Sequence, residues 1–137
     1  MAAPALQELT HALTDEQREA ATHGPGPLLV VAGAGSGKTT MLATRLAWLV
    51  AQGADPARVL LLSFSRRAAA ELGERAAAQL HRSLGLPAGT APPRLPWCGT
   101  FHGIATRLLR AEAAALGLDP GFSVLDPADA GELMAQQ

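Results

Sequence analysis

The chain of 137 residues is predicted to be an α/β domain in which helices flank a parallel sheet. Two observations predict this class. Short apolar runs alternate along the chain with longer segments of helical periodicity, and a glycine-rich turn joins the first apolar run to a helix. Strands that alternate with helices form parallel sheets with right-handed crossovers. The length fits one domain of ~100–150 residues.

Two short apolar runs, residues 27–31 and 59–64, are predicted as buried strands because they are rich in leucine and valine and are too short for helices. Residues 98–101 are predicted as a short third strand. The predicted helices cover residues 14–23, 38–52, 67–84, 104–116 and 127–134. Glycines at positions 53, 85 and 117 follow three of them, as is usual at helix carboxyl ends. Residues 122–125 are predicted as a short extended piece.

The first helix begins with a predicted capping box. Thr14 has the side chain of an N-cap, and Gln17 stands three residues later. Residues 1–12, which contain alanine and proline, are predicted as a flexible arm or a short helix before this helix. The dense turn signal at 23–27 ends it.

The glycine-rich turn matches the Walker A pattern of phosphate-binding loops, except that Ala32 replaces the first glycine. Its residues are Ala32, Gly33, Ala34, Gly35, Ser36, Gly37, Lys38 and Thr39. Consecutive backbone N–H groups and the amino end of the following helix attract an anion. Lys38 is the only lysine in the chain, against ten arginines, which indicates that this position requires an ammonium group. The loop therefore predicts nucleoside triphosphate binding, against the alternative of a flexible glycine-rich loop that holds a lysine by chance.

The charge distribution is uneven although the net charge is −1. Between residues 58 and 110 lie eight arginines and two acidic residues, a local charge of +6. This excess indicates either a contact surface for a phosphate backbone or a solvated helix face that carries arginine. The single cysteine excludes an internal disulfide and a cysteine-based metal cluster. With no apolar run of 18 residues and no secretory signal, we expect no membrane partner and a cytoplasmic location.

Four segments, taken in order, resemble the first motifs of the UvrD/Rep family of superfamily 1 DNA helicases. They begin at Leu13 (LTDEQREA), Ala32 (AGAGSGKT), Ser63 (SFSRRAAAEL) and Gly99 (GTFH). The resemblance covers about residues 13 to 134. It implies that residues 13–137 form part of a RecA-like ATP-binding domain of the P-loop NTPase class, truncated before its Walker B region.

The resemblance implies an ATP site with Mg²⁺. Lys38 and Thr39 would be the catalytic residues of the loop, with Lys38 on the β and γ phosphates and the Thr39 hydroxyl on Mg²⁺. Gln17 would bind the adenine edge, since a carboxamide offers both a donor and an acceptor; its other interpretation is a helix cap. Thr40 stands where many relatives have an arginine near the base, so that contact is altered here.

The resemblance also implies single-stranded DNA as a partner. Phe64 would stack a base, against the alternative of a core phenylalanine. Ser63 and Ser65 stand where the family usually has threonines, Arg66 replaces a usual asparagine, and Arg67 keeps the charge of a usual lysine. Thr100 and His102 belong to the Gly-Thr-Phe-His segment, also near DNA in the family.

The implied function is an ATP-dependent 3′-to-5′ DNA helicase or translocase, of which this chain is the ATP-binding portion. The family's carboxylate pair and its later arginines are not recognisable here, so the carboxyl-terminal helicase domains are expected to be needed for activity. Two alternatives remain: a stand-alone P-loop nucleotide-binding module without helicase activity, and a small P-loop kinase. A kinase would need a phosphate-gripping arginine cluster in its lid, and the candidate lid at 85–96 lacks one.

Overall fold

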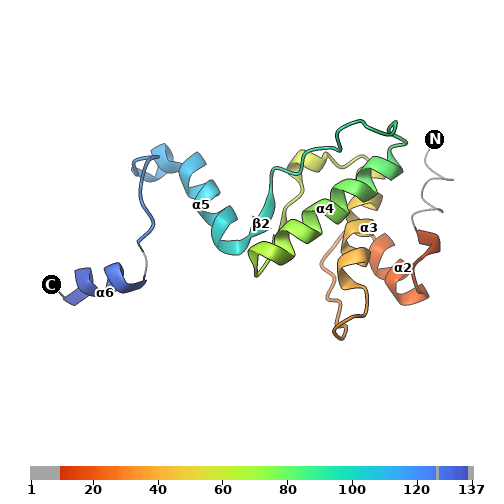
Figure 1. Cartoon of the computed structure of the whole chain (residues 1–137), viewed down its shortest axis with the longest axis horizontal. Helices are drawn as coiled ribbons and strands as arrows, with labels where there is room; N and C mark the ends of the chain where they lie inside the picture. The colour runs from red at the N-terminus through yellow and green to blue at the C-terminus, as the bar shows by residue number, and fades with distance from the viewer. Residues whose placement is uncertain (1–9, 126, 136–137) are drawn as a thin grey trace. The chain divides into compact units, whose positions relative to one another are not determined.

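A computed structural model describes residues 10–125 and 127–135 and divides the chain into two compact units, the first ending at Phe101 and the second beginning at His102. Residues 1–9 of the predicted arm lie outside the described residues. The first unit contains the elements α2 (Asp15–Thr22), α3 (Lys38–Ala51), η1 (Pro56–Arg58), β1 (Leu61–Ser63), α4 (Arg66–Ser83) and β2 (Cys98–Thr100) (Figure 1). Helices α2, α3 and α4 begin and end within one or two residues of the predicted bounds, whereas η1 was not predicted.

The two strands of the first unit confirm the predicted α/β class. Strands β1 and β2 pair in parallel, with Leu61 opposite Cys98 and Ser63 opposite Thr100. Helix α4 connects them and packs against both. Both strands are shorter than their apolar runs.

The predicted strand at residues 27–31 is wrong. The segment has no strand assignment, and its apolar side chains are exposed in alternation: Leu28 47%, Leu29 87%, Val30 39% and Val31 88%. Alternation shows an extended backbone with one side partly covered, but a strand also needs a hydrogen-bonded neighbour. Among the described residues the only paired strands are β1 and β2, so this segment does not belong to a sheet.

The main core forms between α3, α4 and β1, and Figure 1 shows α3 against α4. Leu46 of α3 and Leu80 of α4 are almost fully buried. The buried members of this cluster are Ala43, Leu46, Ala47, Leu61, Leu72, Ala76 and Leu80. Alanines recur on the facing surfaces of both helices, which lets the two backbones approach closely.

Gly73 lies in the middle of α4, where glycine costs about 0.5–1 kcal/mol relative to alanine. A Cβ atom at this position would lie 3.2 Å from the Sγ atom of Cys98 on β2. The glycine therefore allows α4 to lie close against the strand. Burial raises the pKa of the Cys98 thiol, whose Sγ donates to the carbonyl of Ala69 at 3.6 Å.

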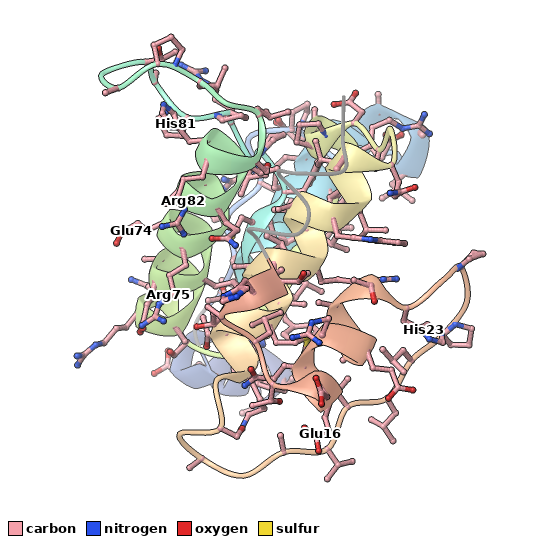
Figure 2. The ribbon with its side chains drawn as sticks, turned by 90° about the vertical axis from the view of Figure 1, so that its right-hand side faces the viewer. Glu16, His23, Glu74, Arg75, His81 and Arg82 are labelled. Atoms are coloured by element: carbon pink, nitrogen blue, oxygen red, sulfur yellow. The ribbon has the colours of Figure 1, made fainter. Side chains whose placement is uncertain are left out.

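Helix α2 is attached to α3 at both ends of its length. A second buried cluster joins Leu13 and Ala21 to Met41 of α3. At the carboxyl end of α2, the Arg45 guanidinium donates to the carbonyls of Ala21 at 3.2 Å and of His23, the residue labelled in Figure 2. Because α2 has no basic residue in its own last turn, Arg45 supplies the cation that the helix carboxyl end favours.

The second unit contains most of α5 (Phe101–Ala111), the short helix η2 (Ala113–Leu116) and α6 (Pro127–Ala135). Helix α5 begins three residues before its predicted start, although Gly103 lies in its first turn, and it ends at Ala111, five residues before its predicted end. The short helix η2 covers the rest of the predicted segment. Ile104 and Ala113 are buried, and the Arg110 guanidinium lies 5.5 Å from the Phe122 ring centroid. The predicted extended piece at 122–125 has no strand assignment. Within the described residues no helix is long and apolar enough to span a membrane.

Candidate functional site

The predicted phosphate loop is an exposed turn that leads into α3. Gly35 and Gly37 have positive φ angles of 74° and 82°, which only glycine adopts without strain. The Ser36 hydroxyl donates to the Gly33 carbonyl at 2.6 Å and closes the turn. Gly37 stands at the N-cap of α3 and offers no side chain to the first helical amides. Those amides and the positive end of the helix dipole suit an anionic ligand.

Lys38 is the first residue of α3, and its side chain folds back over the loop. Its Nζ atom donates to the carbonyl oxygens of Ala32, at 2.9 Å, and of Gly33. The side chain is exposed. The ammonium group is therefore held over the loop by two of the loop carbonyls.

A cavity of about 220 Å³ opens beside the loop. It is lined by Thr14, Glu16, Gln17, Ala20, Val30, Val31, Ala32, Ser36, Lys38 and Met41. The walls are mainly apolar, and the polar groups gather where α2 meets the loop. This volume is below the ~300–1,000 Å³ typical of pockets for drug-sized ligands. The cavity alone is therefore smaller than a complete pocket for a ligand of that size.

Gln17 stands between the cap of α2 and the phosphate loop. Its Oε1 atom accepts from the Thr14 N–H at 3.0 Å, and the Thr14 hydroxyl accepts from the Gln17 N–H at 3.3 Å, so the predicted capping box is confirmed. Its Nε2 atom donates to the Ser36 carbonyl at 2.7 Å. The carboxamide thus lines the cavity and also contacts the loop.

Glu16 is the one acidic side chain that lines the cavity, and Figure 2 shows it on α2 beside the loop that precedes α3. Its own backbone N–H, at the start of the helix, and then the Thr14 hydroxyl hold the pKa of this carboxyl below its usual value. The carboxylate is therefore ionised at neutral pH. Sequence reasoning did not select Glu16, although its position next to Gln17 in the first helical turn could have indicated it.

The two threonines after Lys38 face different surroundings. Thr39 is half-buried in the first turn of α3, next to the lysine. The Thr40 hydroxyl accepts from Nη1 of Arg75 on α4 at 3.4 Å, and Arg75 pairs with Glu71 at 2.7 Å. Neither Thr39 nor Thr40 is among the residues that line the cavity.

The predicted DNA-contact residues of the first unit gather at the carboxyl ends of β1 and β2. Ser63 pairs with Thr100 in the last register position of the sheet. Directly after this pair, Phe64 and Phe101 lie side by side, with ring centroids 5.2 Å apart and ring planes inclined by 31°. Phe64 is 92% exposed and Phe101 is 47% exposed, so Phe64 is not a core residue.

Phe101 was not among the residues selected from the sequence. The pairing of Ser63 with Thr100 explains its position, because residues that follow a register pair in parallel strands lie next to each other. The signal in the sequence was an aromatic residue immediately after each strand. Its meaning depended on the register of the strands, which the sequence did not reveal.

Helix α4 begins beside Phe64. The Ser65 hydroxyl accepts from the Ala68 N–H at 3.1 Å and caps the helix. Arg66 and Arg67 form its first turn without an acidic residue, and both are exposed. Cations are unfavourable at a helix amino end, so these arginines leave a positive charge that suits a phosphate partner. His102, in the second unit, is exposed near the start of α5.

The described residues contain no group of three or more histidine, cysteine, aspartate or glutamate side chains that could hold a metal ion. A site made only of protein ligands is therefore not formed by this part of the chain. Mg²⁺ commonly binds through one or two protein oxygens together with nucleotide phosphates. The Thr39 hydroxyl fits that manner of binding.

Comparison with known proteins finds several DNA helicases that are similar to this chain over most of its length. The UvrD1 ATP-dependent DNA helicase of Mycobacterium leprae is 40% identical over 131 residues, 94% of this chain and 16% of the relative. The PcrA ATP-dependent DNA helicase of Leuconostoc citreum is 38% identical over 94% of this chain and 16% of its own length. DNA helicase II of Escherichia coli is 41% identical over 88% of this chain and 16% of its own length.

These relatives share the chain's phosphate-loop region but extend well beyond it, since the chain spans about 16% of their length. The family described as "UvrD/REP helicase N-terminal domain" matches residues 13–137. The match begins one residue before the N-cap of α2 and includes both strands, the phosphate loop and α4. The chain therefore belongs to the UvrD/REP helicase N-terminal domain family.

Proposed function

We propose that this chain is the ATP-binding portion of an ATP-dependent DNA helicase that acts on single-stranded DNA. One observation carries the proposal: an anion-binding loop with a lysine over it lies directly beside a mainly apolar cavity that presents a carboxamide. Relatives at about 40% identity bear the name of ATP-dependent DNA helicase. The activity of the whole protein is proposed from those names, since the chain spans only a small part of each relative.

The base is proposed to enter the cavity next to Gln17, with the phosphates along the loop at the amino end of α3. Lys38 would exchange the carbonyls of Ala32 and Gly33 for β and γ phosphate oxygens, which are stronger acceptors for an ammonium group. Thr39 would provide a hydroxyl to Mg²⁺. The ion would offset phosphate charge.

Single-stranded DNA is proposed to cross the carboxyl ends of β1 and β2. Two adjacent exposed rings, Phe64 and Phe101, offer faces on which bases can stack. Arg67 on the first turn of α4 would contact the DNA backbone, as would the polar side chains Ser63, Ser65 and Thr100. His102 is included because it follows Phe101 in the chain. The 3′-to-5′ direction of movement is proposed from the family resemblance alone.

A titration of the purified chain with a fluorescent ATP analogue and Mg²⁺ tests this function. Lys38→Ala removes the ammonium group and is expected to weaken binding by about 10- to 150-fold, because hydrogen bonds to charged groups contribute ~1.5–3 kcal/mol. Arg58→Ala, at an exposed position in η1, removes a cation away from the loop and serves as the control. Equal dissociation constants for the unaltered chain and for Lys38→Ala would show that the loop does not bind the nucleotide phosphates as proposed.

A further inference from the structure

We propose that Gln17 is a positioning residue of the phosphate loop: its hydrogen bond to the Ser36 carbonyl fixes the orientation of the Ser36–Gly37 peptide and so sets the affinity of the loop for phosphate. This role is separate from any contact with a base. It rests on the proposed function, since it requires that the loop bind the phosphates of a nucleotide.

The first support is the way the carboxamide is held. Both of its polar atoms are engaged, Oε1 by the Thr14 N–H at 3.0 Å and Nε2 by the Ser36 carbonyl at 2.7 Å. The capping box fixes the oxygen end to the start of α2. The nitrogen end therefore has a defined position, and it connects two residues that are 19 positions apart in the sequence.

The second support is the planarity of the peptide bond. In a trans peptide the carbonyl of one residue and the N–H of the next point in opposite directions. With the Ser36 carbonyl held toward Gln17, the Gly37 N–H points away from Gln17. Gly37 has a φ of 82° and no Cβ atom, so little intrinsic resistance opposes a flip of this peptide. An external hydrogen bond is what favours one orientation.

The third support is the close approach of the amide to the loop. A Cβ atom at Gly37 would lie 2.6 Å from Nε2 of Gln17. The carboxamide thus occupies the space that any other residue at this position would fill. Its position against the loop backbone is close enough to restrict the loop by contact as well as by hydrogen bonding.

The fourth support is that α2 is fixed to the helix that the loop begins. Arg45 of α3 donates to the carbonyls of Ala21, His23 and Gly24 at the end of α2. Ala21 is fully buried, in one cluster with Met41 of α3. Helix α2 therefore contacts the loop through Gln17, and it also contacts α3, the helix that follows the loop, through Arg45. Gln17 can therefore hold the loop in place and not merely follow it.

Base binding does not require this hydrogen bond to break. A carboxamide nitrogen carries two protons and its oxygen has two lone pairs. Since Ser36 uses one proton and Thr14 one lone pair, one site remains at each end for a base edge. The positioning role and the adenine contact can therefore operate together, and a ligand without a base separates them.

Inorganic tripolyphosphate with Mg²⁺ is that ligand, and calorimetric titration of the chain measures its binding. Gln17→Ala and Gln17→Met both remove the donor to Ser36, and methionine also preserves the length of the side chain. Both are expected to weaken tripolyphosphate binding by about 2- to 10-fold, the range for one neutral hydrogen bond. Circular dichroism verifies that the helices remain.

Arg18→Ala is the matched control. Arg18 contacts the Leu13 carbonyl at 3.3 Å and Asp15 at 2.9 Å, so its removal loosens the start of α2 without touching the loop. We expect its tripolyphosphate affinity to stay within about two-fold of the unaltered chain, as for most surface substitutions. A loss equal to that of the Gln17 variants would show that the integrity of α2, and not the Ser36 hydrogen bond, is what matters.

The remaining outcomes separate the inference from the proposed function. If both Gln17 variants bind tripolyphosphate as well as the unaltered chain, or more tightly, while the unaltered chain binds Mg-ATP, then the positioning role is wrong and the proposed function stands. If the unaltered chain binds neither ligand, the proposed function fails and the inference fails with it.

Discussion

At the scale of single residues, the phosphate loop requires a residue without a Cβ atom at position 37 as much as it requires particular side chains. Gly37 combines a positive φ of 82° with the close approach of the Gln17 amide. The glycine and the capping box of Thr14 and Gln17 were both evident from the sequence, because each is a local pattern. The contact of Gln17 with Ser36 was not, because it depends on how α2 packs against α3.

Gly37→Ala is expected to destabilise the chain more than Gly35→Ala. Both positions have similar positive φ angles, 82° and 74°, so both variants incur the ~1–2 kcal/mol cost of a left-handed L-residue. Only at Gly37 would the new methyl group meet another group, the Gln17 amide at 2.6 Å, whereas the space at Gly35 is open within 4 Å. Thermal unfolding of the two variants measures the difference. Equal shifts in melting temperature would mean that the Gln17 contact imposes no restriction.

At the scale of elements, helices were predicted more accurately than strands, for a physical reason. A helix satisfies its hydrogen bonds internally, so glycines such as Gly53, Gly85 and Gly117 mark its end locally. A strand depends on a neighbour that the local sequence does not specify. Residues 27–31 have a strand's composition but no pairing in the described part of the chain.

Arg45→Ala is expected to detach α2 from α3. The guanidinium donates to the carbonyls of Ala21, His23 and Gly24 and lies 5.1 Å from the Trp48 ring centroid. Its removal should lower the free energy of unfolding by about 1–3 kcal/mol, measured by chemical denaturation. Arg58→Ala, at an exposed site, should change it by less than ~0.5 kcal/mol. Similar effects of the two substitutions would contradict the proposed attachment.

The paired rings at the strand ends predict separate effects of two substitutions on single-stranded DNA binding. Phe64→Ala should weaken binding by roughly 5- to 150-fold, since stacking contributes ~1–3 kcal/mol per base. Arg67→Ala should instead reduce the slope of log K against log salt by about 0.7. Fluorescence anisotropy with labelled oligonucleotides at several salt concentrations measures both quantities.

Phe122→Ala is the control for this experiment, because the third phenylalanine contacts Arg110 in the second unit. It should bind DNA like the unaltered chain. Phe101→Ala should weaken binding in the same direction as Phe64→Ala, since its ring lies 5.2 Å away. Normal binding by Phe64→Ala with an intact circular dichroism spectrum would show that DNA takes another path.

At the scale of the whole molecule, the resemblance of four sequence motifs to a known family indicated the family of the chain, which the packing of helices and strands does not reveal. The order of four motifs indicated the family that the comparisons then showed. The division into two units after Phe101 was not predicted, because no proline- or glycine-rich linker marks it. The basic excess between residues 58 and 110 includes the exposed Arg66 and Arg67 beside Phe64, which the linear charge count alone could not place.

The chain alone is expected to hydrolyse ATP slowly, with little stimulation by single-stranded DNA. Phosphoryl transfer requires positioned groups that stabilise charge and orient water. Among the residues that line the cavity, Glu16 is the one carboxylate, and it is held by the start of α2. A steady-state phosphate-release assay with and without oligonucleotide measures the rate. Strong stimulation by DNA would mean that this chain contains a catalytic carboxylate that has been overlooked.

A nucleotide is proposed to bind between α2 and the phosphate loop. Nuclear magnetic resonance of the isotope-labelled chain, titrated with Mg-ATP, tests this directly, since each backbone amide reports on its own surroundings. The largest shifts are expected on the amides of residues 33–39 and on the side-chain amide of Gln17. At a ligand concentration that half-saturates the unaltered chain, these shifts should be much smaller in Lys38→Ala, because its binding is expected to be weaker. Shifts that fall elsewhere in the chain, or none at saturating Mg-ATP, would contradict nucleotide binding at this site.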